Sequence, residues 1–178
     1  MAYLGEGGAI DQTVGSDWQA RCGIQKIVQT DNYGCGIACL AMVTGTPYDH
    51  AREHFNQLGL GVRRSCRPAY STSSREMLGI LASTGLIVDA RRWRGWNAFH
   101  GLGVLKVRDD WRGKKGRWHW AVAFRHSKFG IVVFDPHECA PSFEEVPMDV
   151  LCFDFRIHEP KGEWFQVEQR IPLETDCG

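Results

Sequence analysis

The spacing of hydrophobic residues changes about halfway along the chain. In the first half, apolar residues recur at helical intervals in segments with recognisable boundary residues. In the second half, short runs of branched and aromatic residues alternate with turn-forming or charged stretches, which is typical of strands. Helices followed by antiparallel strands favour an α+β fold with a helical lobe before a sheet lobe.

Three helices are predicted, each with a boundary signal. The first is apolar throughout and stops at Gly45. The second starts where Thr46 can cap a helix whose first residue is Pro47. The third starts with the capping-box pattern Ser73-x-x-Glu76. The predicted helices cover residues 35–44, 46–58 and 73–85.

Strands are predicted mainly after residue 85. We expect two of them, 119–124 and 130–134, to pair as a hairpin. A short segment before the first helix is expected to be a strand that delivers Gln29 to the site. The predicted strands are residues 24–29, 86–90, 102–107, 119–124, 130–134 and 150–157, with a weaker run at 164–171.

Length and charge limit the possible classes of protein. The 178 residues, of which 43% are hydrophobic, are enough for one domain with a real core. We expect residues 1–20 to be a loosely ordered extension and residues 21–178 to form a single domain. The 21 Lys and Arg residues equal the 21 Asp and Glu residues in number, so no overall field attracts nucleic acid or an anionic membrane. Neither is an expected partner, and the oligomeric state is left open.

The cysteines and the start of the chain predict a reducing compartment. The seven cysteines are odd in number and irregularly spaced, so no disulfide framework is expected. The first residues lack the basic start and apolar core of a signal peptide, and no apolar run reaches membrane-spanning length. A cytoplasmic location is expected, and it would keep a reactive thiol reduced.

Cys35 is the candidate nucleophile because it stands between Gly34 and Gly36 at the start of the first helix. The helix dipole favours an anion there and is expected to lower the pKa of the thiol. The two glycines would leave room for a substrate carbonyl. The amide of Cys35 and the side chain of Gln29 could donate hydrogen bonds to the oxyanion. A cysteine on an apolar helix can also be a small buried hydrophobe, which is the expectation for Cys39.

His119 is the candidate base because it opens the strand HWAVAF. On its face of the strand, Ala121 and Ala123 leave space for a packed element such as the first helix. The next strand ends in Asp135-Pro136, and the hairpin would place Asp135 near His119. A core histidine and a plain Asp-Pro turn would give the same patterns.

The combination of these features resembles a known family. Four signatures occur in the order and approximate spacing that is typical of the papain-like cysteine peptidases. The signatures are Gln29, Cys35-Gly36, His119 at a strand start and Asp135-Pro136 at a strand end. The chain resembles in particular the bacteriocin-processing, double-glycine-leader peptidases, over roughly residues 25–150. It would be a stand-alone member, because it carries none of the membrane-spanning and ATP-binding domains of the exporter-linked members. The resemblance also implies a bacterial or phage origin.

The resemblance implies a papain-like fold in which the nucleophile helix packs on an antiparallel sheet. It implies a cysteine hydrolase that cleaves a peptide or isopeptide bond of a peptide or protein substrate, without a metal or organic cofactor. In this scheme Cys35 is the nucleophile, His119 the base and Asp135 the group that orients the base. Gln29 completes the oxyanion hole.

Substrate contacts are expected close to the candidate nucleophile and base. The candidate substrate-binding residues are Gly34, Gly36, Trp118 and Trp120. Residues 91–118 interleave arginine and lysine with tryptophan, a pattern that suits single-stranded nucleic acid, an acidic peptide or a solvated loop.

Other activities are compatible with the same residues. A papain-like site also supports transferase and deamidase reactions, and an inherited triad can persist in a non-catalytic adaptor or inhibitor. A metal or redox site at Cys35 and Cys39 is disfavoured, because the sequence offers no second cysteine pair at ligand spacing.

Overall fold

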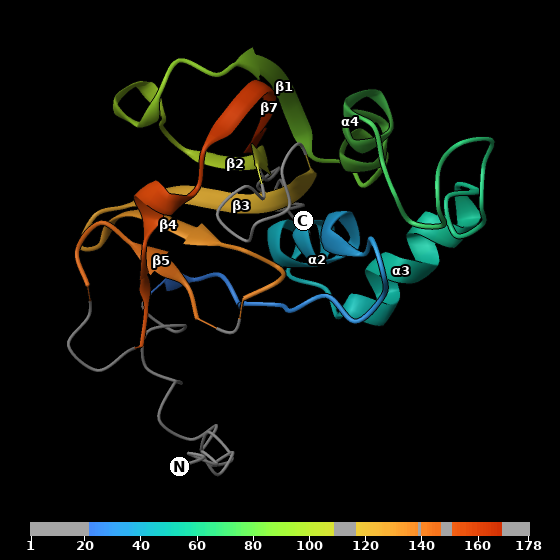
Figure 1. Ribbon diagram of the computed structural model, residues 1–178, viewed down its shortest axis with the longest axis horizontal. Coiled ribbons are helices and arrows are strands. Elements are labelled where there is room, and N and C mark those ends of the chain that lie inside the picture. The colour runs from blue at the N-terminus through green and yellow to red at the C-terminus, as the bar shows by residue number, and fades with distance from the viewer. Residues whose placement is uncertain (1–21, 109–116, 139, 147–150, 169–178) are drawn as a thin grey trace, which may run out of the picture.

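The computed structural model describes residues 22–108, 117–138, 140–146 and 151–168 (Figure 1). Within these ranges, helices come first and a seven-stranded sheet follows, as predicted. The helices are α2 (Cys35–Thr44), α3 (Tyr48–Gln57) and α4 (Ser74–Ser83), with short 3-10 turns η2 (Trp96–Ala98) and η4 (Phe155–Ile157). The strands are β1 (Ile87–Arg92), β2 (Leu102–Arg108), β3 (Trp118–His126), β4 (Gly130–Phe134), β5 (Ser142–Phe143), β6 (Phe153–Asp154) and β7 (Pro160–Glu168).

The sheet has the order β1-β7-β2-β3-β4-β5-β6. Neighbouring strands are antiparallel except for β5 and β6, which are parallel. The predicted hairpin of β3 and β4 is confirmed, with Val122 opposite Phe134. Because β4 ends one residue before Asp135, that carboxylate lies beside the first half of β3.

The helices cover one face of the sheet, and α2 lies between β3 and α3 (Figure 1). The core around α2 includes Trp120, Val122 and Phe124. Ala121 and Ala123 belong to a second core on the opposite face. The prediction that the first helix packs on the alanine face is therefore wrong. The large side chains of β3 bury more apolar area under the mainly apolar α2, whereas the alanines suit the face that is filled by aromatic rings from β7, η2, η4 and the loops beside η2.

The capping box at the start of α4 is present. Ser73 Oγ accepts a hydrogen bond from the Glu76 amide at 3.2 Å, and the Ser73 amide donates to Glu76 Oε2 at 2.7 Å. We expect Ser73→Ala to lower the free energy of unfolding by about 1 kcal/mol, because an amide at the helix start loses its partner. Urea denaturation measures this change. Ser74→Ala is the matched control, and an equal loss in both variants would contradict the prediction.

Several predicted strands differ from the observed ones. Residues 24–29 form no strand, although the Gln29 amide donates to the Pro136 carbonyl at 2.9 Å. The strand predicted at 150–157 is wrong for most of its described length, because only the two-residue β6 forms before η4. The weak run predicted at 164–171 begins earlier, as β7, and is an interior strand between β1 and β2. Whether each of these segments forms a strand depends on partners from distant parts of the chain.

Some predicted features lie outside the described residues. They include the extension at residues 1–20 and part of the Arg- and Trp-rich stretch, residues 109–116. None of the helices in the described ranges has the length and apolarity that crossing a bilayer requires.

Candidate active site

A tight turn before α2 positions Cys35. The Asp31 carbonyl accepts a hydrogen bond from the Gly34 amide at 3.0 Å, and the Asp31 carboxylate accepts one from Tyr48 Oη at 3.1 Å. Tyr33 has a φ of 64°, which is uncommon for an aromatic residue. The backbone is therefore strained two residues before the candidate nucleophile, where the chain enters the helix.

Gly34 and Gly36 allow close packing around the start of α2. A Cβ atom on Gly34 would lie 2.2 Å from Tyr48 Oη, and one on Gly36 would lie 3.2 Å from Thr72 Oγ1. Neither glycine lines the cavity at Cys35. The space beside each glycine is filled by protein atoms, so the expected opening for a substrate carbonyl is not found there.

A cavity of about 60 Å³ brings Cys35 and His119 together. Both residues line it, one at the start of α2 and the other at the start of β3. The backbone of Trp120, the next residue after His119, lies close enough to the Cys35 thiol to lower its pKa. Trp118 and Trp120 also line the cavity, Trp118 with 42% of its surface exposed and Trp120 buried.

His119, which lines this cavity, forms a buried pair with Asp135. His119 Nε2 and Asp135 Oδ2 are 2.9 Å apart, so the predicted hydrogen bond between them is present. The other carboxylate oxygen, Oδ1, accepts the amide of His137 at 2.8 Å. Lys26 Nζ donates to the backbone carbonyl of Asp135. These contacts hold the carboxylate in place at the end of β4.

A second imidazole, that of His158, contacts the same carboxylate oxygen. His158 Nε2 lies 3.2 Å from Asp135 Oδ2, and its Nδ1 lies 3.3 Å from the Phe155 carbonyl. The residue is 1% exposed. No local pattern in the sequence identifies His158, because it follows the turn η4 and meets Asp135 only through the fold of the sheet.

Asp135 is a carboxylate at neutral pH. Burial alone would raise its pKa, but the hydrogen bonds and charges of His119 and His158 outweigh burial and hold the pKa well below its usual range. A charged oxygen beside His119 Nε2 favours a hydrogen on that nitrogen, which fixes the tautomer and the orientation of the ring.

The thiol of Cys35 is protonated at neutral pH. Burial raises its pKa to about 11, although hydrogen bonds from the backbone of Trp120 and Gly36 act in the opposite direction. The charge of Asp135 adds to the increase. The predicted lowering of the pKa by the helix start is therefore wrong, because desolvation between the helices and the sheet exceeds the dipole effect. A base beside the sulfur is needed to form the thiolate.

We expect iodoacetamide to label Cys35 slowly at pH 6 and progressively faster as the pH rises toward 9. A raised pKa lowers the thiolate fraction at every pH below it, and the thiolate is the species that reacts. Mass-spectrometric mapping of the adduct at each pH gives the rate, with the exposed Cys66 as an internal reference. A rate that is already maximal at pH 6 would contradict this and would indicate a preformed thiolate–imidazolium pair.

Gln29 lies next to the site but does not line the cavity. Its Nε2 donates to the Asp31 carbonyl at 3.0 Å. Its Oε1 is buried and has no hydrogen-bond partner among the described residues. Through its backbone bond to Pro136, Gln29 is tied to the strand end that carries Asp135. Its place in an oxyanion hole stays a prediction.

Neither Cys39, the other cysteine of α2, nor the acidic residues of the described ranges belong to a metal-ligand arrangement. Cys39 is fully buried in the core, where its side chain packs as a small apolar group. In the part of the chain that the structure describes, no three His, Cys, Asp or Glu side chains are grouped so that they could hold a metal ion.

Comparison with known proteins identifies the fold. No protein-family model and no curated protein matches the chain by sequence. A double glycine motif protease from an AMS/PCAT transporter, solved in complex with the leader peptide, matches with a TM-score of 0.52 and 18% identity over 83% of this chain and 92% of that chain. The peptidase domain of Streptococcus ComA, a bifunctional ABC transporter involved in quorum sensing, matches with a TM-score of 0.54 and 15% identity over 82% of this chain and 98% of that chain. The protein has the predicted α+β fold of papain-like peptidase domains.

Proposed function

We propose that the protein is a cysteine hydrolase that cleaves a peptide or isopeptide bond. The main support is the cavity that Cys35 and His119 share, with Asp135 bonded to the Nε2 atom of the imidazole. A nucleophile, a base and a group that orients the base are the parts that acyl transfer requires. The fold that the protein shares with two peptidase domains agrees with this proposal.

The reaction begins with a neutral thiol. His119 Nδ1 takes the proton of Cys35 as the sulfur attacks the substrate carbonyl, and Asp135 stabilises the imidazolium that results. The imidazolium then gives the proton to the leaving nitrogen, the C–N bond breaks, and a thioester remains on Cys35. His119 next removes a proton from water, the hydroxide attacks the thioester, and the acid product leaves as the thiol regains its proton.

The oxyanion needs hydrogen-bond donors at the start of α2. We assign one to the backbone amide of Cys35, which is the first residue of the helix. The second is the side-chain amide of Gln29, which has one N–H directed to the Asp31 carbonyl and a second N–H as a further donor. Two donors at the developing charge are the usual arrangement for acyl transfer.

A peptide with small residues next to the scissile bond fits the cavity best. The cavity of about 60 Å³ has little room for a bulky side chain beside Cys35. The exposed rings of Tyr33 and Trp118 flank it and offer surfaces for the adjoining residues. One structural neighbour is named as a double glycine motif protease and was solved with a leader peptide. We propose a substrate of this kind for the present protein.

Profiling with a peptide library tests the proposed activity. Mass spectrometry of the products should show cleavage after small residues, with glycine preferred, and a transient thioester on Cys35. Equal cleavage after large and small residues would contradict the proposed specificity. If no peptide is cleaved and no thioester forms, the non-catalytic adaptor or inhibitor becomes the better account. Products that carry an added amine would identify a transferase.

A further inference from the structure

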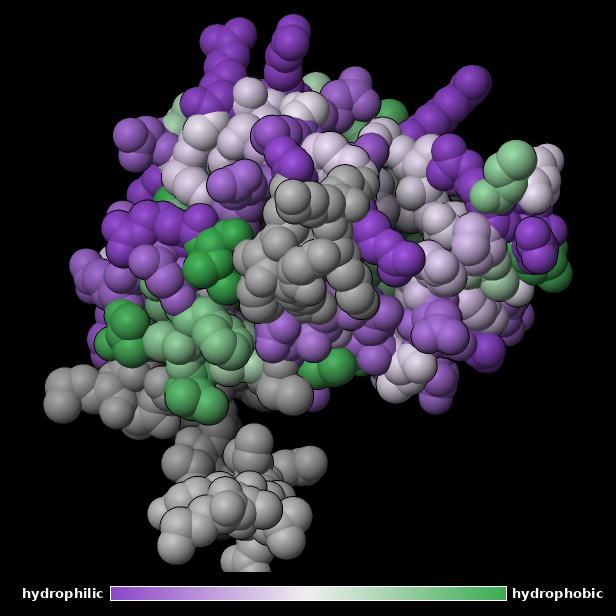
Figure 2. Space-filling view, viewed as in Figure 1, coloured by the Kyte–Doolittle hydropathy of each residue, from purple (hydrophilic) through white to green (hydrophobic). Residues whose placement is uncertain are grey.

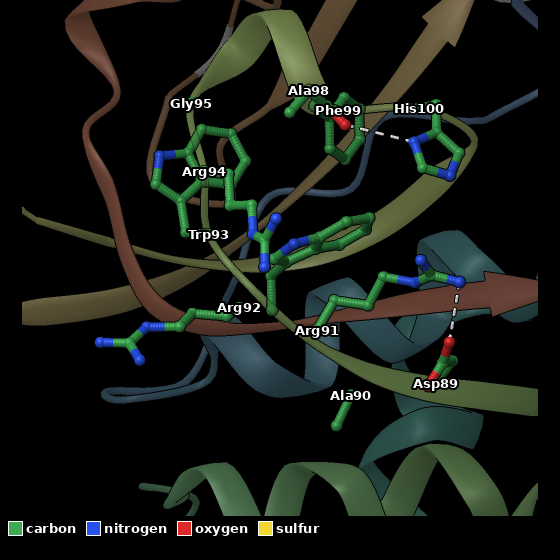
Figure 3. A pocket seen from close by; sticks show the side chains of 11 residues that line it. Asp89, Ala90, Arg91, Arg92, Trp93, Arg94, Gly95, Ala98, Phe99 and His100 are labelled. Carbon is green, nitrogen blue, oxygen red and sulfur yellow. Dashed lines mark hydrogen bonds and ion pairs between the residues drawn. The ribbon is translucent and has the colours of Figure 1, made fainter.

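A pocket of about 470 Å³ lies between the end of β1 and η2, and we name it the β1 pocket (Figure 3). It shares no lining residue with the cavity at Cys35. Its volume is in the range typical of small-molecule sites. Its walls combine aromatic rings with guanidinium groups, from Trp93, Phe99, Trp164, Arg91, Arg92 and Arg94.

The β1 pocket has two arginines that are open to an anion. Arg91 is paired with Asp89 at 2.8 Å. Arg92 and Arg94 form no ion pair with any of the residues in the described ranges, although Glu163 lies opposite Arg92 in the strand register. Figure 3 shows Arg94 turned inward beside Trp93 and Arg92 extending outward at the rim. Long hydrophilic side chains also project from the edge of the molecule where β1 lies (Figure 2).

The aromatic wall of the β1 pocket is held in place by packing and hydrogen bonds. The rings of Trp93 and Trp96 meet edge to face with centroids 4.8 Å apart. The Trp93 amide donates to the Gly162 carbonyl at 2.8 Å, and Arg125 Nη2 donates to the Phe99 carbonyl at 3.2 Å. The indole of Trp93 is nevertheless only half-buried. It is a preformed flat surface beside Arg94, with Arg92 at the rim of the pocket.

We propose that the β1 pocket binds a nucleoside phosphate. The base stacks on the indole of Trp93, and the phosphate oxygens accept hydrogen bonds from Arg92 and Arg94. A simple anion would use the arginines alone and leave the indole without a contact. Arginines that only protect an edge strand from aggregation would need no pocket with aromatic walls. The proposal is independent of the activity at Cys35.

Calorimetric titration of the full chain tests the proposal with three probes: adenosine diphosphate, adenosine and inorganic pyrophosphate. We expect adenosine diphosphate to bind at least about tenfold more tightly than either fragment, because only the whole ligand meets both the indole and the arginines. Quenching of tryptophan fluorescence should accompany its binding. No measurable binding of adenosine diphosphate at millimolar concentration overturns the proposal, as does equally tight binding of pyrophosphate.

Variants locate the site. We expect the double variant Arg92→Gln/Arg94→Gln to weaken binding of adenosine diphosphate at least about tenfold. Arg63→Gln, which removes an exposed arginine outside the pocket, is the matched control and should bind as the parent does. Unchanged binding in the double variant overturns the assignment.

Two further probes identify the source of the ligand. A twelve-residue oligothymidylate that displaces adenosine diphosphate, and that also loses affinity in the double variant, places the nucleoside phosphate in a nucleic-acid strand. Failure to displace it identifies a free nucleotide. An oligoglutamate peptide that binds as tightly as adenosine diphosphate overturns the proposal, because it would mean that the arginines recognise acidic peptides.

Discussion

Replacement of Cys35 by alanine is expected to abolish peptide cleavage and to leave the protein folded. In the proposed mechanism the sulfur forms the covalent intermediate, so no other side chain can replace it. Removing a nucleophile of this kind costs at least about 10³-fold in kcat. The side chain is only partly buried at the start of α2, and alanine is a good helix former, so the melting temperature should change little.

The controls for this variant are another cysteine and the base. Cys66→Ala removes a free, exposed thiol far from α2 in sequence and should keep full activity. His119→Ala should also lose cleavage, and it should slow alkylation of Cys35 by iodoacetamide, because the proton acceptor is gone. If Cys35→Ala retains the parent activity, the proposed chemistry is wrong.

Replacement of Asp135 by asparagine is expected to reduce both stability and activity. Two buried imidazoles lose a charged acceptor and keep at most a neutral one, which should lower the free energy of unfolding by about 2–3 kcal/mol at pH 7. The imidazole of His119 also loses the group that fixes its tautomer, so kcat should fall by about 10²-fold or more. Urea denaturation and steady-state kinetics measure the two effects separately.

The stability loss in Asp135→Asn should depend on pH. The pKa of Asp135 is lower in the folded protein than in the unfolded chain, so the carboxylate stabilises the fold above the unfolded value, near 3.9. That contribution disappears as the pH falls below this value toward the lower pKa of the folded state. The difference between parent and variant should therefore shrink below about pH 4.

A surface aspartate is the matched control for this prediction. Asp154→Asn removes one partner of an exposed ion pair with Arg156 and should cost less than about 1 kcal/mol, with no change in kcat. A pH-independent loss in Asp135→Asn, or a loss no greater than that of Asp154→Asn, would contradict the role given to the buried carboxylate.

The parts of the fold that depend on neighbouring residues were predictable. The apolar run of α2 and the capping box at Ser73 are local patterns, and the structure contains both elements. The hairpin of β3 and β4 is also local, since a short turn joins the two strands. For that reason the contact between His119 and Asp135 followed from the sequence, although the residues are 16 positions apart.

Contacts between distant segments account for most of the predictions that were wrong and for the features that were not predicted. The alternation of residues along β3 showed which side chains share a face of the strand, but not which face α2 covers. The short β6 and the interior position of β7 depend on partners from other parts of the sheet. His158 reaches Asp135 only because η4 precedes it at the correct place in the fold.

The sequence by itself determined the order of helices and strands, the position of Cys35 at a helix start, and the pairing of a histidine with an aspartate across a hairpin. Only the tertiary structure decided that Cys35 and His119 share a cavity, that burial raises the pKa of the thiol, and that a second histidine binds the carboxylate. The reason is physical. The signals for helices, strands and turns come from residues a few positions apart. Desolvation and packing depend on every atom that surrounds a group, whichever part of the chain supplies it.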